Sequence, residues 1–414
     1  MADDQGTIRE VVWQDLFPCL IILRAFRLAI SFRVLVLAAV ALVGVTAGWR
    51  VIGQLYSGSE DQQIQAWSAD LNPWPWEASS SVPVPPGAAD PAGRVEVFLS
   101  GFPSIGHWLA NGPIVQAWRH VAAPFIALFD AELSFAAMTY LTLCCLWSVL
   151  VWALFGGAIT RIAALEFARD ESLGMMSAIR YSSSRWISYF GSPLLPLIFV
   201  LVSAIPLAIL GLLMYFDFFA FIAGILWPLV LVAGLFMAIV LIGLAAGWPL
   251  MLPTISSEGT DAFDALSRSY AYVYQRPLHY FVYALLASLL GIVGFVVVDV
   301  FADAVVGLGA WGVSWGTGTV RMDEIVGAGE DSGWMIRSGS ALIGIWAGCI
   351  AMLKSGFQFA FFWASATAIY LLLRRHVDAT EINEVALEEQ DETHGLPPLT
   401  TDESGISGVA DETS

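Results

Sequence analysis

Lysine is almost absent from this 414-residue chain, because Lys354 is the only one among the 18 lysine and arginine residues. Charged residues of all kinds make up only 13% of the sequence, whereas hydrophobic residues make up 57%. Soluble domains average about 25% charged residues and could not bury so large an apolar fraction. The composition therefore excludes a water-soluble globular protein and is typical of a polytopic membrane protein.

Cysteine is scarce as well, with four residues in the whole chain. Cys144 and Cys145 are adjacent in one apolar run, Cys349 lies in another, and Cys19 stands alone. These positions do not form the spacing pattern of a disulfide framework. We therefore interpret all four as small apolar side chains.

Catalytic and metal-binding motifs are missing from the sequence. It contains no H-E-x-x-H, no P-loop, no nucleophile elbow and no Cys-x-x-Cys. His107 and His120 precede Asp130 and Glu132, but the spacing matches no metal-ligand motif, so ordinary interfacial histidines are the simpler interpretation. We expect no catalytic residues, no cofactor, no bound metal and no nucleic-acid partner.

Six apolar runs are long enough to cross a bilayer as helices, which takes about 20 residues each. They predict spans at about 34–52, 133–158, 194–215, 221–250, 280–300 and within 340–373. The last run is too long for one straight span, so 340–353 is either part of it or an interfacial extension. The predicted fold is all-α, with a six-helix membrane domain over 34–373 and outer loops at about 55–132 and 304–338.

The two ends of the chain differ in amino-acid composition from the membrane domain. Residues 1–33 mix apolar side chains with Arg24, Arg27 and Arg33, which predicts an amphipathic segment with its arginines toward anionic lipid. A lengthened first span is the open alternative. Residues 374–414 form an acidic tail that lacks the apolar content to fold alone.

The distribution of arginine predicts the orientation, because cytoplasmic loops of membrane proteins carry an excess of positive charge. With both termini inside, twelve arginines fall in cytoplasmic segments and five in outer segments. We therefore expect cytoplasmic N and C termini.

One stretch, 248–281, separates two apolar runs and reads WPLMLPTISSEGTDAFDALSRSYAYVYQRPLHYF. It predicts an amphipathic helix on the cytoplasmic membrane surface, capped at its start by Thr260 and ended by Pro277. Asp264 and Arg268 are expected to form an i,i+4 ion pair. The predicted apolar face consists of Phe263, Leu266, Tyr270 and Val273.

A degenerate copy of this stretch lies upstream, at 166–190, and repeats its order of acidic, small, serine, arginine and aromatic residues. Each copy leads into an apolar run, which indicates two related units, each an amphipathic helix followed by a transmembrane helix. Candidate contacts with lipid or a soluble partner are Arg180, Arg185, Arg268 and Arg276. Ordinary positive-inside bias explains these arginines equally well.

Two weaker patterns accompany the spans. GxxxG spacings allow close approach of helices, and they occur at Gly44 and Gly48, Gly243 and Gly247, and Gly344 and Gly348. The tyrosines after Arg268 fit an interfacial aromatic belt, and they are Tyr270, Tyr272 and Tyr274.

Lys354 lies inside the last apolar run, one turn before Gln358. An ionisable group within a membrane is a candidate functional residue, because it costs several kcal/mol there unless it is paired or wetted. Asp299 and Asp303 on the fifth span are its expected partners. These four residues are the candidate intramembrane site. The alternative is that Lys354 reaches the outer headgroups from a helix that starts nearby.

Four phrases together resemble a family of uncharacterised multi-pass membrane proteins of planctomycete-type bacteria. They are LFPCLIILRAFRLAISFRVLVLA, VWALFGGAITRIAALEFARDE, WPLMLPTISSEGTDAFDALSRSYAYVYQRP and YLLLRRHVDATEINEV. ALSRSYAYVYQRP is also loosely similar to the amphipathic repeat in the membrane domain of some glycerophosphodiester phosphodiesterases. The chain lacks that enzyme's catalytic domain and its acid and histidine pattern. The resemblance implies a membrane architecture in a bacterial inner membrane and no site residues.

These observations favour a non-enzymatic inner-membrane protein that acts as a scaffold or accessory subunit. Its expected partners are the lipid bilayer and a membrane protein or a second copy of the chain. The alternative is a small-solute or lipid transporter or channel, favoured by the Pro-interrupted spans and by Lys354. A membrane-embedded enzyme ranks third.

Overall fold

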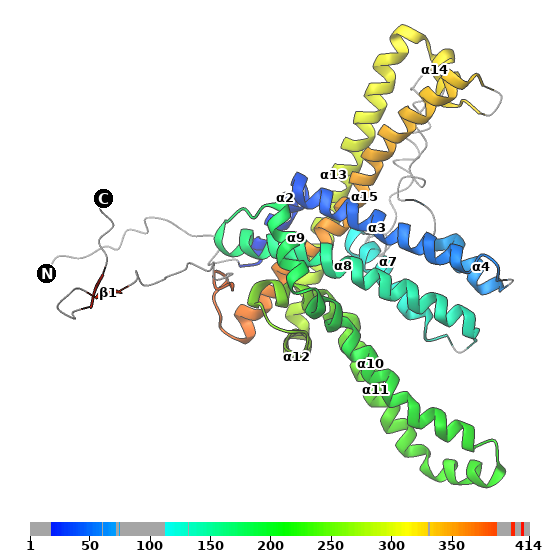
Figure 1. The fold of residues 1–414 in the computed structure, drawn as a ribbon, viewed down its shortest axis with the longest axis vertical. Helices are drawn as coiled ribbons and strands as arrows, with labels where there is room; N and C mark the ends of the chain where they lie inside the picture. Colours follow the sequence, from blue (N-terminus) through cyan, green and yellow to red (C-terminus); the bar gives the residue numbers. More distant parts are fainter. Residues whose placement is uncertain are drawn as a thin grey trace.

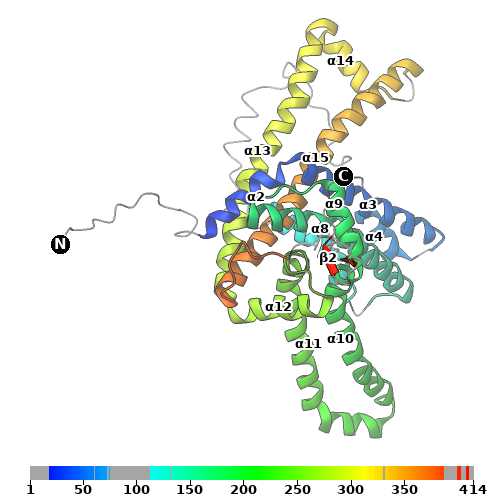
Figure 2. The same cartoon turned by 60° about the vertical axis from the view of Figure 1, so that its left-hand side comes forward.

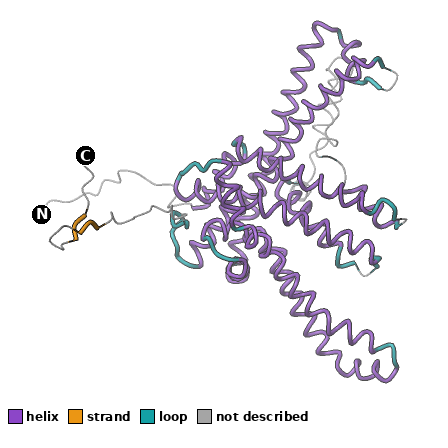
Figure 3. The backbone as a smooth tube through the Cα atoms, in the orientation of Figure 1, coloured by secondary structure: helices purple, strands orange, loops and turns teal. Residues whose placement is uncertain are grey.

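The computed structural model describes residues 18–59, 61–71, 74, 112–130, 132–329, 332–386, 399–401 and 407–409. Nearly all of this backbone is helical (Figure 3). The exception within the described residues is a two-stranded antiparallel hairpin of Leu399–Thr401 (β1) and Ser407–Val409 (β2). The all-α prediction is confirmed.

Six helices are long and apolar enough to cross a membrane, which confirms the predicted number of spans. They are α3 (Phe32–Leu55), α8 (Phe135–Arg169), α10 (Trp186–Leu213), α11 (Asp217–Glu258), α13 (Pro277–Thr317) and α15 (Trp334–Val377). Residues 340–353 belong to the continuous helix α15, not to a separate interfacial segment. Much of the outer loop predicted at 304–338 is also helix, because α13 continues to Thr317.

The short helices are η1 (Pro18–Leu20), α2 (Ile21–Ala29), α4 (Gln62–Leu71), α7 (Pro113–Ala127), α9 (Met175–Ser184), α12 (Ala262–Gln275) and α14 (Thr319–Val326). A short helix leads directly into a long one at three places along the chain: α2 before α3, α9 before α10, and α12 before α13. The sequence predicted a short helix before α10 and before α13, and the relatedness of these two units stays a prediction. At the first of these places, α2 is a helix distinct from α3, so the first span is not lengthened.

The long helices pair into three antiparallel arms, α3 with α8, α10 with α11, and α13 with α15. The arms diverge from a common hub, which consists of α2, α9, α12 and the adjoining ends of the long helices (Figures 1 and 2). The start of α2 and the end of α15 both lie at this hub. A chain that crosses a membrane an even number of times begins and ends on the same side, which agrees with the position of both ends at the hub.

Helix α2 packs into the hub. Arg24 forms an ion pair with Asp170, and Arg33 with Glu166 at 2.5 Å, so these two arginines bind the end of α8. The expectation that they face anionic lipid is wrong, and of the three predicted arginines only Arg27 is exposed.

Helix α12 differs from its predicted form at its start and in its buried face. It begins one residue later than expected, because Asp261 caps it by accepting the N–H of Asp264 at 2.9 Å in place of Thr260. Its buried residues are Ala265, Ser269, Tyr272 and Val273. Of the predicted apolar face, Val273 is buried, Leu266 and Tyr270 are half-buried, and Phe263 is exposed, so the buried face matches the predicted one only in part. The buried face of a helix is the one that its neighbours cover. On α12 this face includes the hydroxyl groups of Ser269 and Tyr272, and both are hydrogen-bonded.

The tyrosines of α12 make hydrogen bonds within the protein. Tyr270 donates to the carbonyl of Val240 at 2.7 Å, and Tyr274 donates to that of Ile239 at 2.5 Å. Tyr272 donates to the Asp378 carboxylate. Tyr272 is buried, so the aromatic-belt interpretation is wrong for this residue, and Tyr270 and Tyr274 link α12 to α11.

Close packing at the hub requires glycine at particular positions. A Cβ atom at Gly294 of α13 would lie 2.7 Å from Phe26 of α2, and one at Gly243 would overlap the ring of Tyr270. Gly48 packs in the same way against Trp147 of α8. Gly344, by contrast, has open space around it, so its GxxxG spacing makes no close contact within the described chain.

The chain beyond α15 begins against the hub. The N–H of Ala386 donates to the carbonyl of Ser257 at 2.8 Å, and Val385 packs against Ala164 and Leu165 of α8. The tail predicted over 374–414 therefore starts with helix and with packed residues. These contacts join the ends of α8, α11 and α15.

Candidate functional site: an apolar cavity between the arms

Helix α7 lies among the arms. It packs against α8, α13 and α15, although its residues fall in the stretch of about 55–132 that was expected to be an outer loop. Pro249 of α11 has no N–H, so the carbonyl of Ala245 loses its partner within the helix. Trp118 of α7 donates its indole N–H to that carbonyl at 3.1 Å. A proline in α11 thus creates the acceptor that holds α7 in place.

His120 fixes the opposite side of α7. Its ring lies 5.1 Å from that of Trp49 and 5.3 Å from that of Phe359, measured between centroids. Burial lowers the pKa of His120 to about 4, so the side chain is neutral near pH 7. His107 lies outside the described residues. Within the described chain, no group of three His, Cys, Asp or Glu side chains could hold a metal ion.

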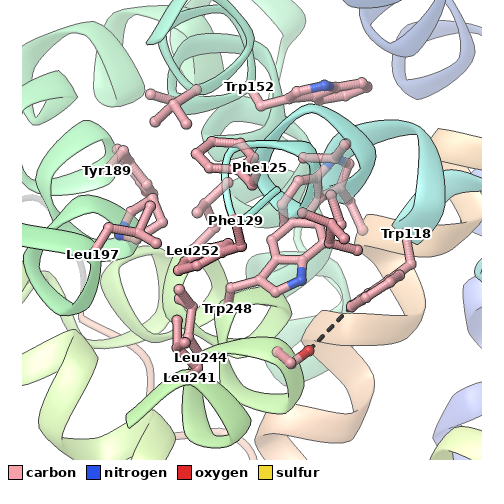
Figure 4. A pocket seen from close by; sticks show the side chains of 18 residues that line it. Trp118, Phe125, Phe129, Trp152, Tyr189, Leu197, Leu241, Leu244, Trp248 and Leu252 are labelled. Atoms are coloured by element: carbon pink, nitrogen blue, oxygen red, sulfur yellow. Dashed lines mark hydrogen bonds between the residues drawn. The ribbon is translucent and has the colours of Figure 1, made fainter. Parts of the chain in front are cut away.

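A cavity of about 310 Å³ lies between α7, α8, α10, α11 and α15 (Figure 4). Seven aromatic side chains line it: Trp118, Phe125, Phe129, Trp152, Tyr189, Trp248 and Trp363. The other lining residues are Val, Ala, Ile, Leu and Pro, and none of the lining side chains carries a charge. Such walls can hold hydrocarbon, and they offer no acid, base or charged group for chemistry.

The side chains that line the cavity are held by contacts with one another and with residues outside it. Trp152 stacks on Phe359 with ring centroids 4.9 Å apart, and Trp248 packs edge-on against Trp363 at 5.7 Å. The hydroxyl of Tyr189 is hydrogen-bonded to the Ser256 Oγ at 2.8 Å. With its polar atom occupied in this way, Tyr189 offers the cavity its ring.

The cavity opens beside the turn that follows α7. Two of its lining residues, Ile126 and Phe129, are 58% and 54% exposed. Helices α10 and α11, which form one side of the cavity, are among the most apolar of the long helices.

Lys354 and its predicted partners lie together in the third arm. The Lys354 ammonium pairs with the Asp299 carboxylate and lies 3.6 Å from that of Asp303. The predicted proximity is confirmed, and Lys354 is paired rather than extended toward headgroups. Gln358, one turn further, is half-buried and makes no hydrogen bond to the described residues around it. None of the four lines the cavity.

The four candidate arginines divide into two pairs. Arg180 and Arg276 are exposed. Arg185 donates to the carbonyl of Gly259, and Arg268 forms ion pairs with Glu258 at 2.9 Å and with Asp378 at 3.6 Å. The predicted pairing of Arg268 with Asp264 is therefore wrong, and Arg185 and Arg268 act as links between hub elements.

Burial acts to lower the pKa of Arg268, but the Glu258 carboxylate, the hydrogen bond with Tyr272 and the nearby Tyr370 together outweigh it, so the pKa is raised. Glu258 also accepts a hydrogen bond from Tyr370 at 2.6 Å and lies 3.7 Å from the Arg374 Nε. This carboxylate joins α11, α12 and α15. Sequence reasoning missed it, although its place directly before Gly259, with that glycine at φ +68°, marks the end of α11.

A buried cation at the hub was also missed. Arg161 of α8 is 3% exposed, donates to the carbonyl of Ser256 at 2.6 Å, and stacks over the ring of Tyr181 at 4.1 Å. Positive charge is favourable at the C-terminal end of a helix, where unpaired carbonyls gather. Arg161 therefore caps α11.

No family model, curated protein or solved structure matches this chain. Its assignment rests on its own helices, which make it a multi-pass membrane protein.

Proposed function

We propose that this chain is a non-enzymatic membrane scaffold that holds the hydrocarbon tail of a lipid in the cavity beside α7. The cavity carries the proposal, because its walls combine aromatic and aliphatic side chains with no charged group. Its opening lies among apolar helices, which are surrounded by lipid in a membrane, so lipid tails are the abundant ligand there. A bound tail would contact α7 and helices of all three arms.

The setting that we propose is a bacterial inner membrane, with the hub on the cytoplasmic side. The excess of arginine in the segments that meet at the hub supports this orientation. Membership of the planctomycete-type family that the sequence resembles is part of the same proposal. A membrane-protein partner or a second copy could then dock on the arms of the scaffold.

Native mass spectrometry tests lipid retention after extraction of the protein in a mild detergent. Ala122 lines the cavity and is half-buried, so Ala122→Phe should fill the space and reduce bound lipid several-fold. Ala208→Phe is the matched control, because Ala208 is exposed on α10 and does not line the cavity. Leu244→Trp fills the cavity from α11 and provides a second variant if the first one folds poorly.

The proposal fails if the wild-type protein retains no lipid. It also fails if both cavity variants, with melting temperatures near that of the wild type, retain as much lipid as Ala208→Phe.

A transporter is the second candidate, and Lys354 with its two carboxylates favours it. This cluster lies in helices long enough to cross a membrane, where charged groups often line an ion or proton pathway. Lys354→Met should abolish flux of a transported solute in proteoliposomes. Unaltered flux of every solute tested, with the variant folded, would rule out translocation through this cluster.

A further inference from the structure

Arg119 is an exposed guanidinium at the edge of the cavity. It follows Trp118 directly on α7 and precedes Ala122 by three residues, and both of these neighbours line the cavity. Residues three apart on a helix share a face and lie about 5–6 Å apart at Cβ. Arg119 is therefore an exposed neighbour of two cavity-lining residues, although it does not line the cavity itself.

Arg119 makes no ion pair and no hydrogen bond with the described residues. The nearest carboxylates along the chain lie beyond α7, at Asp130 and Glu132. Asp130 accepts the N–H of Glu132 at 3.0 Å instead. A cation in a membrane domain costs several kcal/mol unless an anion or water compensates it. An anionic group from outside the described chain would therefore stabilise the guanidinium of Arg119.

We propose that Arg119 binds the phosphate of an anionic phospholipid whose tail occupies the cavity. This inference rests on the proposed lipid-holding function and adds the headgroup class to it. A guanidinium can donate two parallel hydrogen bonds to a phosphate. A zwitterionic headgroup carries its own cation beside the phosphate, so a headgroup with net negative charge gains more from Arg119.

The test uses the full-length protein in nanodiscs of equal parts phosphatidylglycerol and phosphatidylethanolamine. Lipid that stays bound after transfer to detergent is identified by native mass spectrometry. We expect about fivefold enrichment of phosphatidylglycerol on the wild-type protein, the effect of about one favourable charge contact. Arg119→Gln should retain lipid and lose the enrichment, and Arg119→Lys should keep part of it.

Arg337→Gln is the matched control, since Arg337 is also exposed but lies near the start of α15 and does not line the cavity. It should leave the enrichment unchanged. Retained lipid without headgroup preference, equal enrichment on Arg119→Gln, or a retained free fatty acid would each overturn the inference and leave the lipid-holding function standing. A wild-type protein that retains no lipid would overturn both.

Discussion

The hub and the outer parts of the arms differ in how far the chain itself buries their apolar residues. The most apolar 18-residue window of α8 is 61% buried within the chain, and that of α11 is only 6% buried. Helix α11 shows both conditions, because residues 249–257 are buried at the hub whereas Phe221, Leu229 and Leu235 are exposed. A helix that is apolar all round needs either protein or lipid around it.

Polar contacts follow the same division. Ion pairs and side-chain hydrogen bonds join α8, α11, α12 and α15 at the hub, whereas the arm of α10 and α11 is covered by apolar side chains. In lipid, apolar contact alone gives little drive for helix association, so packing and hydrogen bonds must supply it. We therefore expect substitutions at the hub to destabilise the fold and equivalent substitutions far out on the arms to have little effect.

The largest effect is expected at Glu258. Glu258→Ala leaves Arg374, which is 6% exposed, and Arg268 without this carboxylate. Removal of one partner from a buried charge network costs about 3 kcal/mol or more. Glu324→Ala is the matched control on an exposed i,i+3 pair with Arg321 near an arm tip, where the cost is about 0.5 kcal/mol or less. The melting temperature in detergent should therefore fall clearly for Glu258→Ala and not for Glu324→Ala. Equal decreases in both variants would contradict the expected difference between the hub and the arm tips.

His120 provides a test by pH, because α7 is buried among the arms. Its pKa is lowered from 6.5 to about 4 by burial, so the unfolded chain binds a proton at higher pH than the folded chain does. The stability that depends on neutral His120 is present above pH 6.5 and is lost as the pH falls toward 4. At pH 5 the loss is about 2 kcal/mol.

His120→Phe should remove this part of the pH dependence, measured as the difference in melting temperature between pH 7 and pH 5. An unchanged difference would show that His120 is not the group responsible.

Two glycines should give the smallest and most direct contrast. Gly294→Ala places a Cβ atom 2.7 Å from the Phe26 ring, and the forced shift should cost about 1–2 kcal/mol. Gly344→Ala meets open space in a helix interior, so it should stabilise by up to about 1 kcal/mol. Opposite shifts in melting temperature are expected, and a shift of the same sign in both variants would contradict the assigned packing.

The sequence predicted the spans because apolar runs report directly on the membrane. It also predicted the partners of Lys354, since a cation within a span needs an anion at similar depth and few were present. It could not identify the full buried face of α12, because that face is set by packing against other helices, among them α10, α11 and α15. Asp264 is four residues from Arg268, but the ion-pair partners of Arg268 are Glu258 and Asp378. The hub brings the ends of α11 and α15 next to α12, and the sequence alone does not show this.

The cavity was beyond prediction for a related reason. Its lining comes from five helices, and no single stretch of sequence carries a recognisable part of it. One local signal was readable, namely Pro249, which leaves the carbonyl of Ala245 without a helical partner. The sequence could not indicate that Trp118, 127 residues earlier, donates to it.

The divergence of the arms has a mechanical consequence for a surrounding bilayer. α15 alone is about 66 Å long, roughly twice the thickness of a hydrocarbon core, so steep inclination is the way for such helices to fit. A body that is narrow at the hub and wide at the arm tips occupies unequal areas in the two leaflets. Many copies of such a tapered protein at high local density are expected to curve the bilayer, with the hubs on its concave side.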